Sequence, residues 1–361
     1  MISSVRPDIL VSPTARPLMS RKVLTVSPFR VLRDLAASVW LLGIVWIHPS
    51  HALDLLKVQM AFYPQGPQAY MYLALAKGWY RDAGLDVQLL QGRGSNYSVQ
   101  MLSVDHADIG EGELVPLVFA RTRGASIKII AEWYPNDGPA VIVPIDSPIK
   151  NLRDLKNKKI ILTAAGPWPP LLDSFLGEFN LTQSDVSLVY VNSSALFTSY
   201  AVGQGDALMS VGLAFTEANP VRPSRMFNAL DYGVKIPGNG IYVSDQTLAT
   251  KHDVLARFVS VSARALDYIY DGHVSEAANA IVTSAPDAKL GVEILQQQIE
   301  LFADARFLPS TRGRPIGWQS PEEWQERISY LEKARLLEHG HAAGEFFTND
   351  IINAIQRRGG G

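Results

Sequence analysis

Hydrophobic and polar positions along residues 53–361 alternate between two spacings. Leu56–Phe62 has the composition of a strand, whereas the apolar positions between Ala69 and Tyr80 recur at helical spacing on one face. Strands are predicted at 56–62, 85–90, 107–110, 127–133, 140–144, 159–163, 186–191 and 207–211, and helices at 69–80, 171–179 and 195–202. This order predicts an α/β fold whose mostly parallel sheets carry helices on both faces.

The strand and helix pattern occurs twice, which predicts two lobes. Asp108 in HADIG and Asp206 in GQGDALM each stand between a helix and a strand, so the two units echo each other. Extended segments near 140–146 and 238–243 predict a two-strand hinge. The predicted boundaries are 53–142 for the first part of lobe one, 143–240 for lobe two, and 241–361 for the return to lobe one and the C-terminal helices. Since open α/β sheets bind ligands beyond the carboxyl ends of their strands, we expect a ligand cleft between the lobes.

The N-terminal segment has the features of an export signal. Its uncharged apolar run, Leu35–Ile47, has 13 residues, and a membrane-spanning helix needs about 20. Ser50 and Ala52 are small residues at the positions that precede a cleavage site. We therefore predict a signal peptide over residues 1–52 and a periplasmic mature protein. The alternatives are an uncleaved anchor or a buried helix, and Met19 is a second candidate start.

Composition excludes several classes of function. The net charge of -2 gives no electrostatic footprint for nucleic acid, so no nucleic-acid partner is expected. The absence of cysteine excludes disulfides, thiol catalysis and cysteine-ligated metals. The sequence contains no HExxH motif, no phosphate-binding Gly-Lys-Ser loop and no recognisable Ser–His–acid spacing. We expect a monomeric protein that is not an enzyme and has no metal or cofactor.

One segment carries a family resemblance. Leu73–Val87, with the sequence LALAKGWYRDAGLDV, resembles the signature of periplasmic binding proteins for nitrate, sulfonates, taurine and thiamine pyrimidine precursors. Weaker matches follow in order at residues 92–95, at 107–110, and at 151–158, where Asn157 replaces the glycine of the family's D-L-K-G-K pattern.

The resemblance covers about residues 55–270. It implies an NMT1-like substrate-binding protein with the type II periplasmic binding protein fold. It also implies a small-molecule ligand, and an ABC transporter permease and ATPase as partners.

Lobe one offers the first candidate ligand-binding residues. Tyr63 follows the first predicted strand, at a position that faces the cleft in the resembling family. Gly94, Ser95 and Asn96 stand at a predicted helix N-terminus, where backbone N–H groups bind anions or carbonyl oxygens. Plain helix capping is the alternative role for these three residues.

Carboxylate and aromatic side chains follow the next predicted strands. Glu111 is a candidate acceptor for ring N–H or amino groups, and Glu113 beside it can instead provide favourable charge at the next helix N-terminus. Trp133 and Tyr134 end the fourth strand, where aromatic faces would stack on a planar ligand.

Lobe two offers Trp168 as a flat apolar wall. Three of the five residues in Gly166–Pro170 are prolines, which have no N–H group to donate to an oxyanion. The sequence therefore favours an aromatic or heterocyclic ligand over a small oxyanion.

Three other functions stay open. A sulfonate or aromatic acid could bind through Arg93 and Ser95. The same fold permits a ligand-sensing partner of a membrane receptor. Eukaryotic relatives that make the thiamine pyrimidine would, by resemblance, need a cysteine-rich iron site. This third function is disfavoured because the chain has no cysteine.

Overall fold

The computed structural model describes residues 52–135, 137–164, 168–192, 195–285, 289–306 and 309–359. The predicted signal peptide, apart from Ala52, lies outside these residues, and so do Gly166 and Pro167. No helix within the described ranges is long and apolar enough to cross a membrane. Residues 52–361 form one compact unit.

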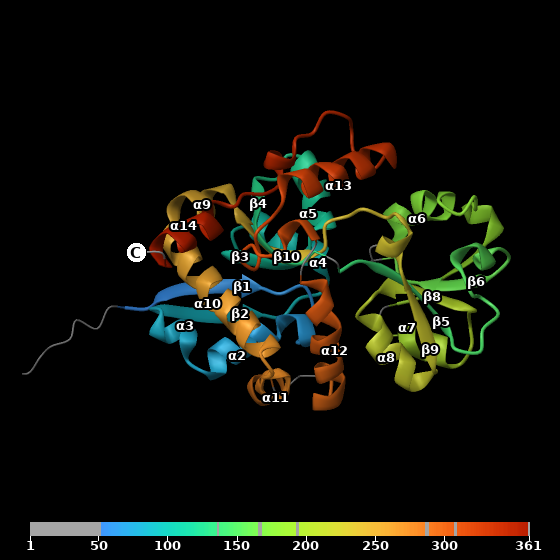
Figure 1. The fold of residues 1–361 in the computed structure, drawn as a ribbon, viewed down its shortest axis with the longest axis horizontal. Helices are drawn as coiled ribbons and strands as arrows, with labels where there is room; N and C mark the ends of the chain where they lie inside the picture. Colours follow the sequence, from blue (N-terminus) through green and yellow to red (C-terminus); the bar gives the residue numbers. More distant parts are fainter. Residues whose placement is uncertain are drawn as a thin grey trace, which may run out of the picture. The chain divides into compact units, whose positions relative to one another are not determined.

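Lobe one is built on a five-stranded mixed sheet with the order β2-β1-β3-β10-β4 (Figure 1). The strands are β1 (Asp54–Gln59), β2 (Leu85–Leu90), β3 (Ile109–Glu113), β4 (Ile127–Tyr134) and β10 (Asn239–Ser244). β1 pairs in parallel with β2 and β3, whereas β10 runs antiparallel to β3 and β4. The chain therefore returns from lobe two into the middle of the first sheet.

Lobe two repeats this arrangement with the order β7-β6-β8-β5-β9. The strands are β5 (Pro139–Pro144), β6 (Lys159–Leu162), β7 (Ser187–Tyr190), β8 (Ala207–Val211) and β9 (Ser224–Asn228). β5 runs antiparallel to both of its neighbours. Each sheet is thus mixed rather than mostly parallel, because each receives the strand that follows a crossover from the other lobe.

The predicted similarity between the lobes arises from the same hydrogen bond, which an aspartate forms in each lobe. Asp108 accepts a hydrogen bond from the backbone N–H of Lys57 at 2.8 Å, and Asp206 accepts the equivalent bond from Lys159 at 2.8 Å. Each aspartate therefore fixes the start of its lobe's central parallel strand pair.

Helices cover both sheets. Those of lobe one are α2 (Ala69–Ala76), α3 (Trp79–Asp82), α4 (Ser95–Ser103), α5 (Val115–Thr122), α9 (Asp245–Thr250), α10 (His252–Tyr270), α11 (Val274–Ser284) and α12 (Val292–Ala305). Two more C-terminal helices are α13 (Pro321–Lys333) and α14 (Asp350–Gly359), and those of lobe two are α6 (Trp168–Gly177), α7 (Leu196–Ala201) and α8 (Ala214–Val221). The single helix predicted at 69–80 is divided because Gly78 adopts a left-handed conformation with φ 73°.

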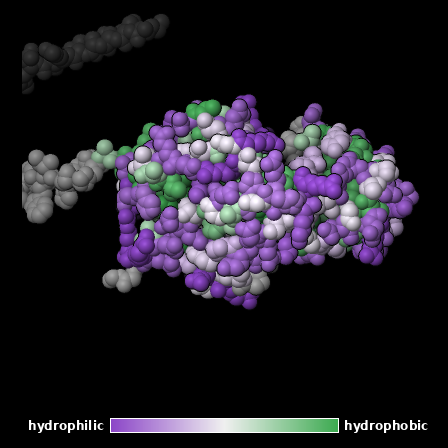
Figure 2. All heavy atoms as spheres, turned by 90° about the horizontal axis from the view of Figure 1, so that it is seen from above, coloured by the Kyte–Doolittle hydropathy of each residue, from purple (hydrophilic) through white to green (hydrophobic). Residues whose placement is uncertain are grey.

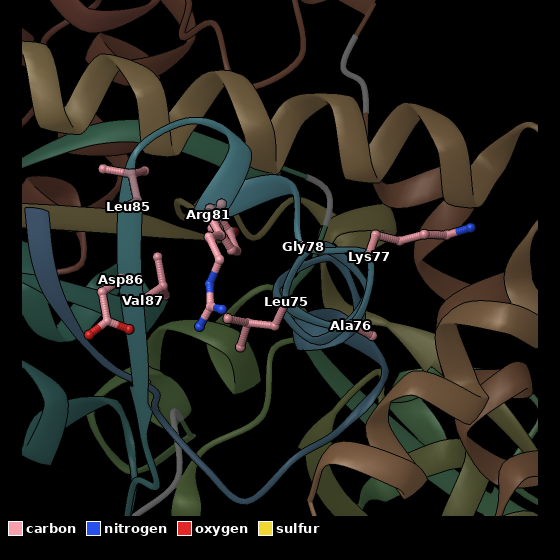
Figure 3. Close-up of a pocket in the computed structure, with 9 residues that line it drawn as sticks. Leu75, Ala76, Lys77, Gly78, Arg81, Leu85, Asp86 and Val87 are labelled. Carbon is pink, nitrogen blue, oxygen red and sulfur yellow. The ribbon is translucent and has the colours of Figure 1, made fainter. Parts of the chain in front are cut away.

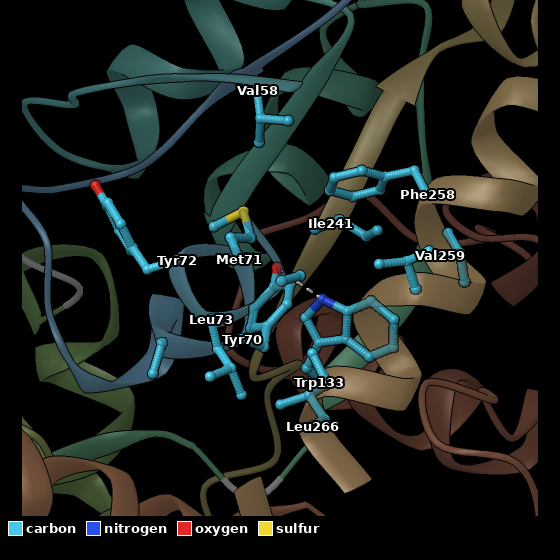
Figure 4. Close-up of a cluster of buried hydrophobic side chains, with 14 of the residues drawn as sticks. Val58, Tyr70, Met71, Tyr72, Leu73, Trp133, Ile241, Phe258, Val259 and Leu266 are labelled. Atoms are coloured by element: carbon cyan, nitrogen blue, oxygen red, sulfur yellow. Dashed lines mark hydrogen bonds between the residues drawn. The ribbon is translucent and has the colours of Figure 1, made fainter. Parts of the chain in front are cut away.

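The core of lobe one packs helices α2 and α10 against the sheet (Figure 4). Tyr70, Trp133 and Phe258 are fully buried in this cluster. The face drawn in Figure 2 is mainly hydrophilic, with apolar atoms gathered in small patches. Most apolar positions of the strands are buried in the core.

Candidate ligand-binding site at the hinge

Two crossovers, at residues 134–139 and 233–239, connect the two sheets. The two crossovers run side by side. Gly238 packs so closely against Tyr134 that an added Cβ would lie 2.0 Å from the Tyr134 carbonyl oxygen. The backbone N–H of Leu114 also donates to the Gly238 carbonyl at 2.9 Å. The carboxyl ends of β3 and β4 thus meet both crossovers at one place.

Glu111 is fully buried at this place and is held by three donors. Its Oε2 accepts the backbone N–H of Ala61 at 3.1 Å, and its Oε1 accepts the side-chain amide of Gln68 at 2.9 Å. Asn239 donates the third hydrogen bond, and burial raises the pKa of Glu111. The carboxylate fixes the segment after β1, so its acceptor capacity is largely used inside the protein.

Glu113 and Asp137 face a small hollow at the junction of the crossovers. We call it the hinge hollow, and it is lined by Glu113, Val115, Asp137, Gly138, Pro139, Val211, Ile236, Pro237 and Gly238. Burial, followed by the charge of Glu111, raises the pKa of Glu113 to about 7. Burial and the charge of Glu113 raise the pKa of Asp137 well above its ordinary value. Among the residues that line the hollow, none is a lysine or arginine, so these two acidic groups face each other without a cationic partner.

The glycine-rich loop before α4 supports Glu113. The hydroxyl oxygen of Ser95 accepts the backbone N–H of Glu113 at 3.1 Å, and Ser95 also forms a hydrogen bond with the Glu113 side chain. The N–H of Gly94 donates to the Ala61 carbonyl at 2.6 Å, and Asn96 is exposed. The Gly94 N–H is therefore already hydrogen-bonded within the protein, and the Ser95 hydroxyl is hydrogen-bonded to the Glu113 carboxyl group.

The three candidate aromatic walls lie in the core. The Trp133 indole donates to the Tyr70 hydroxyl at 3.1 Å (Figure 4), and the Tyr134 hydroxyl donates to a backbone carbonyl. The Trp168 indole donates to the Ser210 carbonyl at 2.8 Å and packs edge-on against Phe175. At exposures of 0%, 2% and 1%, none of the three presents a free ring face in this structure.

Tyr63 is the candidate aromatic residue that stays half-buried. Its hydroxyl forms a hydrogen bond with Glu217 of α8, so it reaches from lobe one to lobe two. Burial raises the pKa of Tyr63 to about 12 and that of Glu217 to about 7. The Lys289 ammonium lies 5.1 Å from the centre of the Tyr63 ring. Tyr63 therefore stands where the two lobes meet.

A second pocket, of about 330 Å³, lies away from the hinge (Figure 3). Its walls come from α2, α3 and the start of β2, namely Leu75, Ala76, Lys77, Gly78, Tyr80, Arg81, Leu85, Asp86 and Val87. The residues of the family signature thus build a corner of lobe one, and no residue of lobe two lines this pocket.

Asp137 and Asn239 were not among the candidates from the sequence. Asp137 follows the fourth strand in a Pro-Asn-Asp-Gly turn, which is a signal that could have indicated it. Asn239 has no such signal, since its place beside Glu111 depends on the antiparallel return of β10. The described residues contain no group of three or more side chains that could hold a metal ion.

Two mixed sheets joined by two crossovers define a two-lobed periplasmic binding protein fold. The alkanesulfonate-binding protein SsuA from Xanthomonas axonopodis pv. citri, in its structure bound to MOPS, has this fold. It matches with a TM-score of 0.63 at 16% identity, over 82% of this chain and 98% of that one.

The chain belongs to the NMT1/THI5-like family, which matches residues 67–273. Its relatives include the formylaminopyrimidine-binding protein of Halalkalibacterium halodurans, at 21% identity over 82% of this chain and 91% of that protein. The riboflavin-binding protein RibY of Chloroflexus aurantiacus is 22% identical over 83% of this chain and 86% of that protein. The family and fold expected from the signature are thereby confirmed.

Proposed function

We propose that the protein is an exported periplasmic solute-binding protein that captures a nitrogen heterocycle between its two lobes, beside the hinge hollow, and delivers it to an ABC permease and ATPase. The hollow itself measures about 20 Å³ in this structure, the space of about one water molecule, so the lobes must open for a ring to reach its carboxyl groups. The observation that carries this proposal is the pair of carboxyl groups, Glu113 and Asp137, which face the hollow without a lysine or arginine among its lining residues. Ser95 and the Gly138 backbone each supply one hydrogen bond to this pair, and burial still raises both pKa values, so further N–H donors from a ligand would stabilise the ionised carboxylates.

The same pair argues against a small oxyanion. A sulfonate or nitrate would lie beside two acidic groups that repel an anion when they are ionised, and no lysine or arginine lines the hollow to bind it. Arg93, the cation considered for such a ligand, lies on the exposed loop with its guanidinium 5.8 Å from the Tyr97 ring centre. The Gly94 N–H already donates a hydrogen bond to the Ala61 carbonyl, so it is not available to an oxyanion. An amino-substituted ring with several N–H groups fits the acceptors better.

The names of two relatives support this ligand class. One is named for binding formylaminopyrimidine and the other for binding riboflavin, and both ligands are nitrogen heterocycles. Both names describe binding rather than synthesis, and the absence of cysteine also disfavours a pyrimidine synthase.

Calorimetry on the mature protein tests the ligand class. Formylaminopyrimidine, riboflavin, an alkanesulfonate and nitrate are the probes. Glu113→Gln and Asp137→Asn should each weaken binding of the heterocycle roughly tenfold, since a hydrogen bond to a charged group contributes about 1.5–3 kcal/mol. Asp82→Asn, which changes an exposed carboxylate on α3 that lines neither pocket, is the matched control and should leave affinity unchanged. Tight sulfonate binding, with no effect of either hollow variant, would contradict the proposal.

The transport role needs a separate assay. The permease and ATPase encoded nearest to this chain would be reconstituted in proteoliposomes, and uptake of the bound heterocycle measured. Ligand-dependent uptake that requires this protein supports transport, and binding without any uptake would favour the sensing alternative.

A further inference from the structure

A buried ion pair joins the C-terminal helix α13 to the hinge. Arg327 of α13 donates to both carboxylate oxygens of Glu132, at 2.9 and 2.8 Å. Only 5% of the Arg327 side chain and 3% of the Glu132 side chain are exposed. Both hydrogen bonds come from one nitrogen, Nη1, which leaves Nη2 of the rigid, planar guanidinium to bind a second partner in a fixed direction.

This pair also contacts each of the two crossovers. Arg327 donates a further hydrogen bond to the carbonyl of Pro135 in the first crossover, at 3.1 Å. Glu132 accepts the backbone N–H of Gly238 in the second crossover, at 2.9 Å. One ion pair therefore holds both chain segments that must bend if the lobes move.

The helix that carries Arg327 is itself firmly anchored. The hydroxyl of Ser320 caps its N-terminus by accepting the N–H of Glu323. Trp324, Ile328 and Leu331 are fully buried beneath it. The buried, capped helix α13 therefore holds the Arg327 guanidinium in a fixed position. This helix follows residues 67–273, the part of the chain that matches the family.

The geometry points to Glu132 and Arg327 as a hinge brace, a pair of positioning residues that sets how freely the two crossovers bend. Neither residue lines the hinge hollow, so neither is placed to touch a ligand there. Their effect on binding would come through the positions of Asp137 and Gly238, the residues of the hollow next to the braced backbone groups.

An exposed pair on the same helix provides a matched comparison. Glu326 of α13 contacts Lys235 of the second crossover at 2.5 Å, with side chains 57% and 56% exposed. Solvent screens such a pair, so it should contribute little to the hinge.

Hydrogen–deuterium exchange on the full mature chain tests the brace without a ligand. The double variant Glu132→Leu/Arg327→Leu removes both charges together, which avoids leaving one charge buried alone. Amide exchange in peptides covering 134–139 and 233–239 should rise about tenfold, while peptides from β1 and β6 should not change. Arg327→Lys keeps the charge but loses the planar guanidinium that reaches Glu132 and Pro135 together, and should give an intermediate rise. Glu326→Gln should match the wild type.

The affinity measurement rests on the proposed function and uses formylaminopyrimidine as the probe. The brace variants should weaken its binding about tenfold by reducing the population of the binding-competent hinge. Unchanged exchange at the crossovers in the folded double variant, or an equal rise across both sheets, would overturn the brace. A wild-type protein that does not bind the probe would instead contradict the proposed ligand, and the exchange result would still decide the role of the pair.

Discussion

The Trp168→Ala variant distinguishes two roles for Trp168, as a wall of the binding site or as a residue of the core. The side chain is 1% exposed, its ring centre lies 4.5 Å from that of Phe175, and its indole donates to the Ser210 carbonyl at 2.8 Å. Truncation of a buried tryptophan costs about 3–5 kcal/mol of stability. We therefore expect Trp168→Ala to lower the free energy of unfolding by that amount, and to lower the melting temperature by roughly 10 °C.

Two further variants make the measurement specific. Trp168→Phe keeps an aromatic ring but leaves the Ser210 carbonyl without its donor, which costs about 1–3 kcal/mol. Tyr190→Ala, at a side chain that is 51% exposed, should change stability by less than about 0.5 kcal/mol. Urea unfolding followed by circular dichroism gives all three values.

The ligand affinity of Trp168→Ala is the measurement that could refute the assignment of Trp168 to the core. If Trp168 is a core residue, the folded fraction of Trp168→Ala should bind the best heterocyclic probe within about threefold of the wild type. The stacking role expected from the sequence requires a loss of about tenfold or more, because a stacking contact and its buried area together exceed about 1.4 kcal/mol. A variant with wild-type stability and a tenfold loss of affinity would refute the core assignment.

Other consequences concern the hinge. Since the pKa of Glu113 rises from 4.5 to about 7 on folding, its contribution to stability is fully present below about pH 4.5 and is lost as the pH rises through about 7; urea unfolding of Glu113→Gln should show a weaker pH dependence. Gly238→Ala places a Cβ 2.0 Å from the Tyr134 carbonyl and should cost about 1–3 kcal/mol or more by thermal unfolding. Tyr63→Phe removes the hydrogen bond to Glu217, and calorimetry should show affinity weakened about fivefold, since one hydrogen bond contributes about 1 kcal/mol.

The sequence predicted the order of the elements because short apolar strands and amphipathic helices follow local spacing. The echo between Asp108 and Asp206 was also visible, since each aspartate precedes a strand in a similar local context. Two features were not predicted. The mixed sheets arise from β5 and β10, whose partners are set by the path of the chain through the other lobe.

The burial of the aromatic side chains was equally inaccessible from the sequence. Trp133 and Tyr134 end a strand, as a binding-site residue would, but Tyr70 of α2 packs against Trp133, and Phe302 of α12 and Pro67 contact Tyr134. The Arg327 contact with Glu132 joins residues far apart in the chain, and no local pattern marks it. Sites that depend on long-range contacts therefore need the fold before they can be assigned.

The two lobes repeat each other at the start of their strands but differ where the strands end. In lobe one, β3 ends in Glu111, Gly112 and Glu113, whereas the equivalent β8 of lobe two ends in Met209, Ser210 and Val211. Of these lobe-two residues, Val211 lines the hinge hollow. Under the proposed function, the polar contacts to a ligand come from lobe one and the first crossover, and lobe two adds apolar cover. A ligand would therefore bind to lobe one first. Lobe two would then close over it and exclude water from the carboxyl groups of Glu113 and Asp137.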